Sequence, residues 1–236
     1  MAINRGPNII RDGLVLCMDA ADKNSYPGSG TTWFDLSGNN NNGTLINGPT
    51  FSGGNGGSIV LDGVNDYVNL GTPSLLNGVQ VPLTICMWAK ANSFIGYNVL
   101  WAADKVLTGG GLYSLLRVDL GVLRYYTTNS GGGYQSNGSP NLLPSTNVWN
   151  FYAVTVSGTL ASPTVTLYLN NSSQSYSYSQ LSSSPNLTVN FRIGTSERTN
   201  GEHWNGNISN ALWYNKALTA QEILQNYNAL KSRFGL

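Results

Sequence analysis

Apolar residues in this chain occur in short runs that are separated by glycine, asparagine, serine and proline. Residues 149–156 and 165–169 alternate between apolar and polar positions, which is the period of two expected of a strand with one buried face. Residues 14–18 are apolar throughout, as is typical of a strand buried on both faces. Further apolar runs of strand length are residues 59–61, 67–70, 83–90, 99–103, 112–118, 122–127, 191–194 and 208–214.

One helix is predicted near the C-terminus. Thr219 and Glu222 have the spacing of a capping box, in which the threonine hydroxyl accepts a bond from the Glu222 amide and the carboxylate reaches back. The apolar residues that follow at helical spacing are Ile223, Leu224, Tyr227 and Leu230. We expect this short helix to pack on an edge or an end of a sheet.

Many short strands with a single helix indicate an all-β fold of antiparallel sheets, either a sandwich or a barrel. The sequence contains neither an internal repeat nor a linker, so residues 13–236 are expected to form one domain. Residues 1–12 precede the first strand and are expected to be either an arm that docks on a partner or a short tether.

The stretch from residue 19 to residue 55 is expected to be irregular, because glycine, asparagine and proline are dense in it. It also carries large apolar residues, which a disordered loop would not. The residues expected to pin it to the core are Trp33, Leu36, Leu45 and Phe51.

Charged residues make up only 10% of the chain, the net charge is +1, and apolar residues make up 41%. A sizeable core can therefore form under a neutral surface that is rich in hydrogen-bonding groups. This composition argues against nucleic acid as a partner, because phosphate binding needs clustered Lys and Arg. No stretch has the length and apolarity of a transmembrane helix, and the first residues lack the apolar core of a secretory signal. We therefore expect the protein to be made in a host cytoplasm. We do not expect it to insert into a membrane.

Cys17 and Cys86 each lie in an apolar run. We expect two buried thiols that act as small hydrophobic side chains. A disulfide remains the alternative, since sequence does not show whether the two residues are adjacent. Two cysteines and one histidine are too few for a structural zinc site.

The turn at residues 62–66 joins two predicted strands and carries three oxygen-bearing side chains, Asp62, Asn65 and Asp66. Such a turn can bond to its own backbone amides, and we favour this interpretation. The alternative is a calcium site, for which Asp104 or Asp119 would have to supply a further carboxylate. No other cofactor is expected.

Aromatic residues are candidates for carbohydrate binding, because a sugar offers a C–H face that stacks on a ring and hydroxyls that need polar partners. The chain has 13 tyrosines and 6 tryptophans, and most of the tryptophans fall in predicted strands. The aromatic residues less committed to a core are Tyr97, Tyr125, Tyr126, Tyr134, Tyr176, Tyr178 and Trp204. From these we select as candidate sugar contacts Tyr97, Tyr134, Tyr176, Tyr178 and Trp204. Tyr176 and Tyr178 share one strand face, which would equally suit a protein contact.

Hydrolysis is the least favoured function. Glycosidases use two carboxyl groups on either side of the scissile bond. The glutamates here are Glu197, Glu202 and Glu222, and the last belongs to the capping box. No predicted strand carries two acids on one face, and His203 has no evident nucleophile or orienting acid. We therefore expect no enzymatic activity.

Five blocks of sequence occur in an order that resembles the laminin-G-like branch of the concanavalin A-like lectin/glucanase superfamily. They are residues 61–68 (LDGVNDYV), 83–90 (LTICMWAK), 149–155 (WNFYAVT), 167–171 (LYLNN) and 193–223. The resemblance extends over about residues 13–230. It implies a jelly roll of two curved antiparallel sheets, a fold in which many members bind carbohydrate or calcium.

The first fifty residues resemble, more narrowly, the opening of lectin-like structural proteins of tailed bacteriophages. The resemblance rests on residues 13–21, 25–33 and 35–39. It implies a non-enzymatic protein of the virion surface, in the capsid as decoration or in a tail or fibre, that binds carbohydrate weakly. Its partners would be other virion proteins, a surface polysaccharide and further copies of itself. The alternative is a purely structural decoration protein with a lectin fold and no glycan ligand.

Overall fold

The computed structural model describes residues 7–73, 81–104, 113–128, 134–136, 141–178, 181, 189–197 and 202–236. Of Tyr113, Thr128 and Tyr134 it describes the backbone alone. None of the helices in these residues has the length and hydropathy needed to cross a bilayer.

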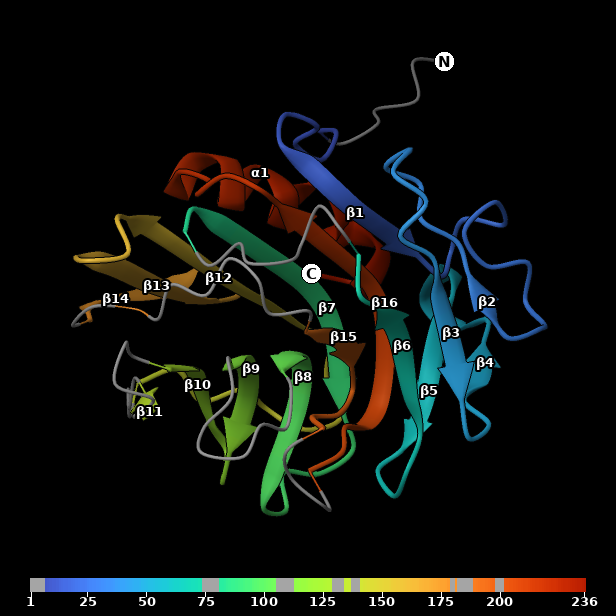
Figure 1. The fold of residues 1–236 in the computed structure, drawn as a ribbon. Helices are drawn as coiled ribbons and strands as arrows, with labels where there is room; N and C mark the ends of the chain where they lie inside the picture. Colours follow the sequence, from blue (N-terminus) through green and yellow to red (C-terminus); the bar gives the residue numbers. More distant parts are fainter. Residues whose placement is uncertain are drawn as a thin grey trace.

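The strands form two antiparallel sheets that pack face to face as a sandwich (Figure 1). The first sheet has the spatial order β14 (Ser172–Ser177), β13 (Pro163–Leu169), β12 (Asn150–Gly158), β7 (Leu83–Ala91), β16 (Asn205–Tyr214), β5 (Ser58–Asp62) and β4 (Thr50–Ser52), with β1 (Leu14–Asp19) also paired to β16. The second sheet has the order β11 (Tyr134–Ser136), β10 (Val122–Thr128), β9 (Tyr113–Asp119), β8 (Tyr97–Asp104), β15 (Asn190–Ile193), β6 (Tyr67–Gly71), β3 (Gly43–Ile46) and β2 (Thr32–Trp33). This architecture confirms the predicted all-β sandwich with one short C-terminal helix.

The core lies between the two sheets, because alternate residues of each strand point inward. In β13 buried and half-buried residues alternate along the whole strand. Three aromatic rings from both sheets meet there: the ring centroids of Trp101 and Trp213 are 4.6 Å apart, and those of Phe191 and Trp213 are 5.0 Å apart. The opposite faces of the sheets are therefore left for other contacts.

The outer face of the first sheet is covered by the helix α1 (Ala220–Leu230) and the short 3₁₀ helix η2 (Lys231–Phe234). The predicted capping box is present, since the Glu222 amide donates to the Thr219 hydroxyl at 3.2 Å and the Thr219 amide donates to the Glu222 carboxylate at 2.8 Å. Trp88 of β7 stacks on Phe234 with ring centroids 4.4 Å apart. Figure 1 shows α1 lying across this sheet, far from β8, β9 and β10.

The described part of the N-terminal arm lies against α1 and β16. The Ile10 amide donates to the Asn226 side chain at 2.8 Å, and the Tyr214 hydroxyl donates to the Ile10 carbonyl at 3.0 Å. Ile9 and Ile10 pack against the apolar cluster beneath α1. From Asn8 onward the arm is thus part of the domain's packing.

Cys17 and Cys86 are both buried free thiols, as expected. They pair in register with Leu212 from opposite sides, so two strand spacings separate them. That separation is about 9.6 Å, which exceeds the reach of a disulfide.

Part of the stretch expected to be irregular is in fact strand, because β2, β3 and β4 lie within residues 19–55. These strands have two to four residues, too few to show an alternating pattern. Trp33 and Leu45 are buried in the main core, which confirms their predicted role. Leu36 and Phe51 are half-buried and pack against apolar clusters.

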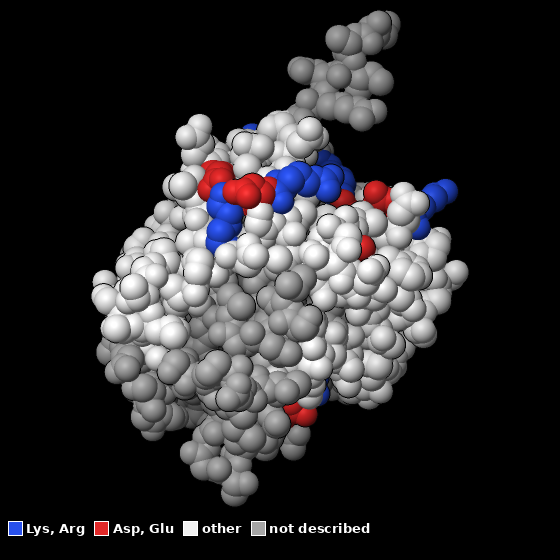
Figure 2. All heavy atoms as spheres, turned by 45° about the horizontal axis from the view of Figure 1, so that its top comes forward, with Lys and Arg blue, Asp and Glu red and all other residues white. Residues whose placement is uncertain are grey.

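Charged side chains are sparse on the face that Figure 2 presents, where they gather in a band across an otherwise uncharged surface. At the start of α1, Lys216 pairs with Asp12 at 2.7 Å and with Glu222 at 3.0 Å. Because the chain has few charged residues, a second group of charged side chains is a candidate functional site.

Candidate functional site

A second concentration of charge lies on the outer face of β8, β9 and β10. Leu116, Val118 and Leu123 of these strands belong to the main core, so the residues that alternate with them face outward. In register, Tyr97 pairs with Asp119, Arg117 pairs with Arg124, and Leu115 pairs with Tyr126. We call the following set the arginine–tyrosine cluster: Tyr97, Arg117, Asp119, Arg124, Tyr126 and Glu202.

Arg117 is the centre of the arginine–tyrosine cluster. Its guanidinium carbon lies 4.4 Å from the ring centroid of Tyr97 and 4.2 Å from that of Tyr126, so that the two rings sandwich it. Its Nη1 donates to Glu202 at 2.7 Å, and its Nε lies 2.5 Å from the Asp119 carboxylate. Arg117, Asp119 and Glu202 are all buried, and cation–π contacts of this kind gain strength when water is excluded.

Arg124 is the more accessible of the two arginines, with 29% of its side chain exposed. Its Nε lies 3.5 Å from Asp119, which thereby bridges two arginines that face each other across the strands. The Tyr126 hydroxyl also donates to Asp119, and burial raises the pKa of Tyr126. Two arginines and two carboxylates balance in charge.

A second polar group lies further along the same face. The Ser196 hydroxyl and the Glu197 amide both donate to the Asp104 carboxylate of β8, the latter at 3.0 Å. Burial raises the pKa of Asp104 above its usual range. Arg192 of β15 pairs with Glu197 at 3.2 Å. Since Glu202 is held by Arg117, the segment between β15 and β16 is tied to this face at both ends.

The four predicted sugar contacts whose side chains are described do not form one group. Tyr97 belongs to the arginine–tyrosine cluster and is 46% exposed. Tyr176 and Tyr178 are half-buried against the core, and the Tyr178 hydroxyl donates to the Tyr125 carbonyl at 2.9 Å. The side chain of Tyr134 lies outside the described residues.

The selection of Trp204 needs correction. Its side chain is fully buried, and its ring makes an edge contact with Tyr152 at a centroid distance of 5.9 Å. Trp204 immediately precedes β16, where the chain enters the core, so its ring serves packing and is closed to a ligand.

Sequence reasoning missed most of the arginine–tyrosine cluster. The residues of this cluster that are absent from the predicted site residues are Arg117, Arg124, Tyr126 and Glu202. Asp119 is predicted only as a possible further calcium ligand. A signal was nevertheless present, because a hairpin about residues 120–121 places the polar positions of its two strands on one face.

The turn at residues 62–66 bonds to itself. The Asp62 carboxylate accepts from the amides of Val64, Asn65 and Asp66, and the Asp66 carboxylate accepts from the Asp62 amide at 3.2 Å. The Val64 amide contributes most to lowering the pKa of Asp62. The described residues include no group of three or more His, Cys, Asp or Glu placed to hold a metal ion. The geometry is that of the favoured interpretation, an Asx-type turn.

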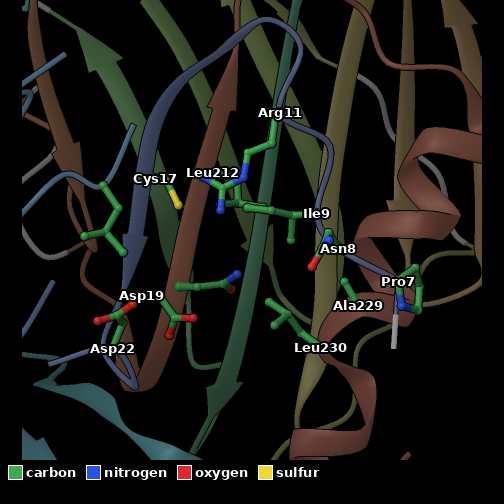
Figure 3. Close-up of a pocket in the computed structure, with 12 residues that line it drawn as sticks. Pro7, Asn8, Ile9, Arg11, Cys17, Asp19, Asp22, Leu212, Ala229 and Leu230 are labelled. Atoms are coloured by element: carbon green, nitrogen blue, oxygen red, sulfur yellow. The ribbon is translucent and has the colours of Figure 1, made fainter. Parts of the chain in front are cut away.

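A pocket of about 300 Å³ lies on the other side of the molecule, between the N-terminal arm, β1, β16 and α1. Figure 3 shows Arg11 reaching toward Cys17 and Leu212 inside it. Burial raises the pKa of Cys17 to about 12, so the thiol stays protonated at neutral pH. No aromatic residue lines this pocket, which therefore lacks a stacking face for a sugar.

The sheet order, the covered face and the polar face define a lectin-type β-sandwich. Residues 62–224 match the model of the concanavalin A-like lectin/glucanases superfamily, and the chain belongs to this superfamily. No curated protein matches the sequence significantly.

Solved structures of three proteins share the fold. Domain 4 of the extracellular arabinanase AbnA from Geobacillus stearothermophilus, solved with arabinotriose, has a TM-score of 0.69 at 16% identity, with 91% of this chain and 98% of that chain covered. The binding domain of Paraclostridial Mosquitocidal Protein 1 has a TM-score of 0.69 at 19% identity, with 93% and 52% covered. The botulinum neurotoxin serotype D domain in complex with N-acetylneuraminic acid has a TM-score of 0.64 at 15% identity, with 92% and 51% covered. This chain spans about half the length of the two toxin domains. At these identities the likeness establishes the fold.

Proposed function

We propose that this chain is a non-catalytic, carbohydrate-binding protein of a phage particle surface, and that its glycan contact is the arginine–tyrosine cluster. The observation that carries the proposal is Tyr97, a half-exposed ring held by Arg117 beside the partly exposed Arg124. A fixed aromatic ring next to polar donors is the combination that sugar recognition uses. The arabinanase domain and the neurotoxin domain, which share this fold, were solved with saccharides bound.

The contacts of the carboxylates support a binding function over hydrolysis. Asp119 and Glu202 are buried and both pair with Arg117, so these carboxyl groups are occupied within the protein. A glycosidase needs two carboxyl groups that flank the scissile bond of its substrate. Asp104 has a raised pKa, but it is fully buried beneath Ser196, so a glycosidic oxygen has no path to it.

The place on a virion is supported by the sequence resemblance of the first fifty residues to phage structural proteins. The partners we propose are other capsid or tail proteins, a surface polysaccharide and further copies of the chain. Weak binding by each copy would be multiplied by copy number. The second candidate is a purely structural decoration protein, which the low overall charge and polar surface suit equally well.

A glycan array with the purified chain, run in calcium and in chelator, tests the proposal. We expect the intact protein to bind at least one polysaccharide and Tyr97→Ala to lose that binding. Leu224→Ala is the control, because Leu224 is an exposed apolar residue on α1, away from the second sheet. Cosedimentation with particles that lack the protein runs in parallel. Particle binding with an empty array would favour the decoration protein, and loss of array binding in chelator would bring Asp62, Asn65 and Asp66 forward as calcium ligands.

A further inference from the structure

We infer that the saccharide bound at the arginine–tyrosine cluster is anionic, and that the terminal amino groups of Arg124 bind its carboxylate. This inference rests on the proposed function. It concerns the chemical class of the ligand, and the evidence for it is the set of contacts that Arg124 makes.

Arg124 is partly exposed, with 29% of its side chain accessible, and its terminal nitrogens make no hydrogen bond to the described residues. Within the described part of the chain its one acidic neighbour is Asp119, which lies on the Nε side at 3.5 Å, and Arg117 faces it on the adjacent strand. The Nε of Arg124 is buried and makes no hydrogen bond to the described residues, so Asp119 holds it through charge alone. A guanidinium anchored in this way presents two parallel N–H bonds, which match the two oxygens of a carboxylate.

The other charged groups of the arginine–tyrosine cluster are buried and pair with one another. Asp119 and Glu202 are each 6% exposed and face Arg117. Because the two acids already balance the two arginines, a ligand carboxylate meets no unpaired negative charge there. The accessible charged group is Arg124, which would repel a cationic sugar and which bonds more strongly to a carboxylate than to the hydroxyls of a neutral sugar.

The two turns next to Tyr97 expose aliphatic side chains, which suit the apolar side of a sugar ring. Ile95 and Leu120 are 84% and 75% exposed, and the Leu120 amide donates to the Gly96 carbonyl at 3.0 Å, which holds the two turns together. Tyr97 starts β8 directly after the first of these turns. The exposed aliphatic residues and Tyr97 therefore lie at the same end of the second sheet, where Tyr97 pairs with Asp119.

The test compares each polysaccharide that the intact protein binds with its carboxyl-reduced form, in which every uronic or sialic carboxylate is an alcohol. We expect the bound polysaccharides to be carboxylated, and we expect carboxyl reduction to weaken binding about ten- to a hundredfold, the loss typical of a charge-assisted pair. Arg124→Gln should weaken binding of the acidic form to a similar degree and should no longer distinguish the two forms. Arg124→Lys should bind the acidic form more tightly than Arg124→Gln and less tightly than the intact protein, because lysine keeps the positive charge but lacks the planar pair of donors.

Arg192→Gln is the matched control, since Arg192 is another arginine of this face that pairs with a glutamate. It should leave the preference for the acidic form unchanged. Melting curves of all variants establish that each is folded. Equal binding of the acidic and reduced forms, or a wild-type preference for neutral polysaccharides, would overturn this inference while leaving the proposed function in place. An array with no bound glycan would overturn the proposed function itself.

Discussion

Arg117→Leu is predicted to destabilise the protein strongly, because it leaves the buried Glu202 carboxylate without its ion-pair partner and leaves Asp119 with the more distant Arg124. The side chains of Arg117, Asp119 and Glu202 are 9%, 7% and 8% exposed, so water can solvate the stranded charges only in part. Removing one partner of a buried ion pair costs about 3–5 kcal/mol. The stacking of the guanidinium on Tyr97 and Tyr126 is lost in addition.

Urea unfolding followed by tryptophan fluorescence measures this loss directly. A decrease of about 3 kcal/mol in the free energy of unfolding corresponds to a fall of roughly 6–12 °C in Tm for a chain of this size. Arg192→Leu is the comparison, since its pair with Glu197 is more exposed and should contribute no more than about 1 kcal/mol. The double variant Arg117→Leu with Glu202→Gln should recover stability, because the second change removes a stranded charge.

Two outcomes would refute this reasoning. If Arg117→Leu and Arg192→Leu cost the same, burial would not be what makes the Arg117 pairs matter. If Glu202→Gln destabilised the Arg117→Leu variant further, the loss would come from packing and not from an uncompensated charge.

Three further predictions concern stability. Asn226→Ala should cost about 2–3 kcal/mol in urea unfolding, because the Ile10 amide and the Tyr214 hydroxyl each lose a buried partner; an unchanged midpoint would mean that water replaces the side chain. Leu120→Asn should raise stability by about 0.5–1 kcal/mol, since Leu120 holds a φ of 47° that asparagine tolerates better, and a lowered Tm would show that the leucine packs on something. Asp104 has a raised pKa in the folded state, so the folded protein binds more protons than the unfolded chain above pH 3.8, and the contribution of this residue to stability falls as pH rises through that window. The stability of Asp104→Asn should therefore rise relative to that of the wild type as the pH increases from 4 to 7. If the two proteins gave parallel curves of unfolding free energy against pH, this prediction would be wrong.

The sites that sequence predicted differ in one physical respect from the site that the structure assembles. Asp62 and Asp66 lie within one turn, and the bonds that they make to nearby amides follow from local spacing. Arg117 and Glu202 are 85 positions apart and meet only because β9 and the segment before β16 approach the same face. A contact of that separation leaves no trace in local spacing.

The choice among aromatic residues shows the same division. Composition and strand period named Tyr97, Tyr176 and Trp204 as candidates, but each could face inward or outward. Packing decided that Trp204 is closed in the core and that Tyr176 lies half-buried against it, while Tyr97 keeps an exposed ring.

The sequence by itself determined the strand-rich class, the capped helix and the polar turn at residues 62–66, because a period of two, a Thr-x-x-Glu pattern and a cluster of Asp and Asn act over a few residues. Only the tertiary structure decided the pairing of β2, β3 and β4, the two-strand separation of Cys17 and Cys86, and the arginine–tyrosine cluster. Strand order depends on which distant segments bury the most apolar surface together, and that quantity is a property of the whole fold.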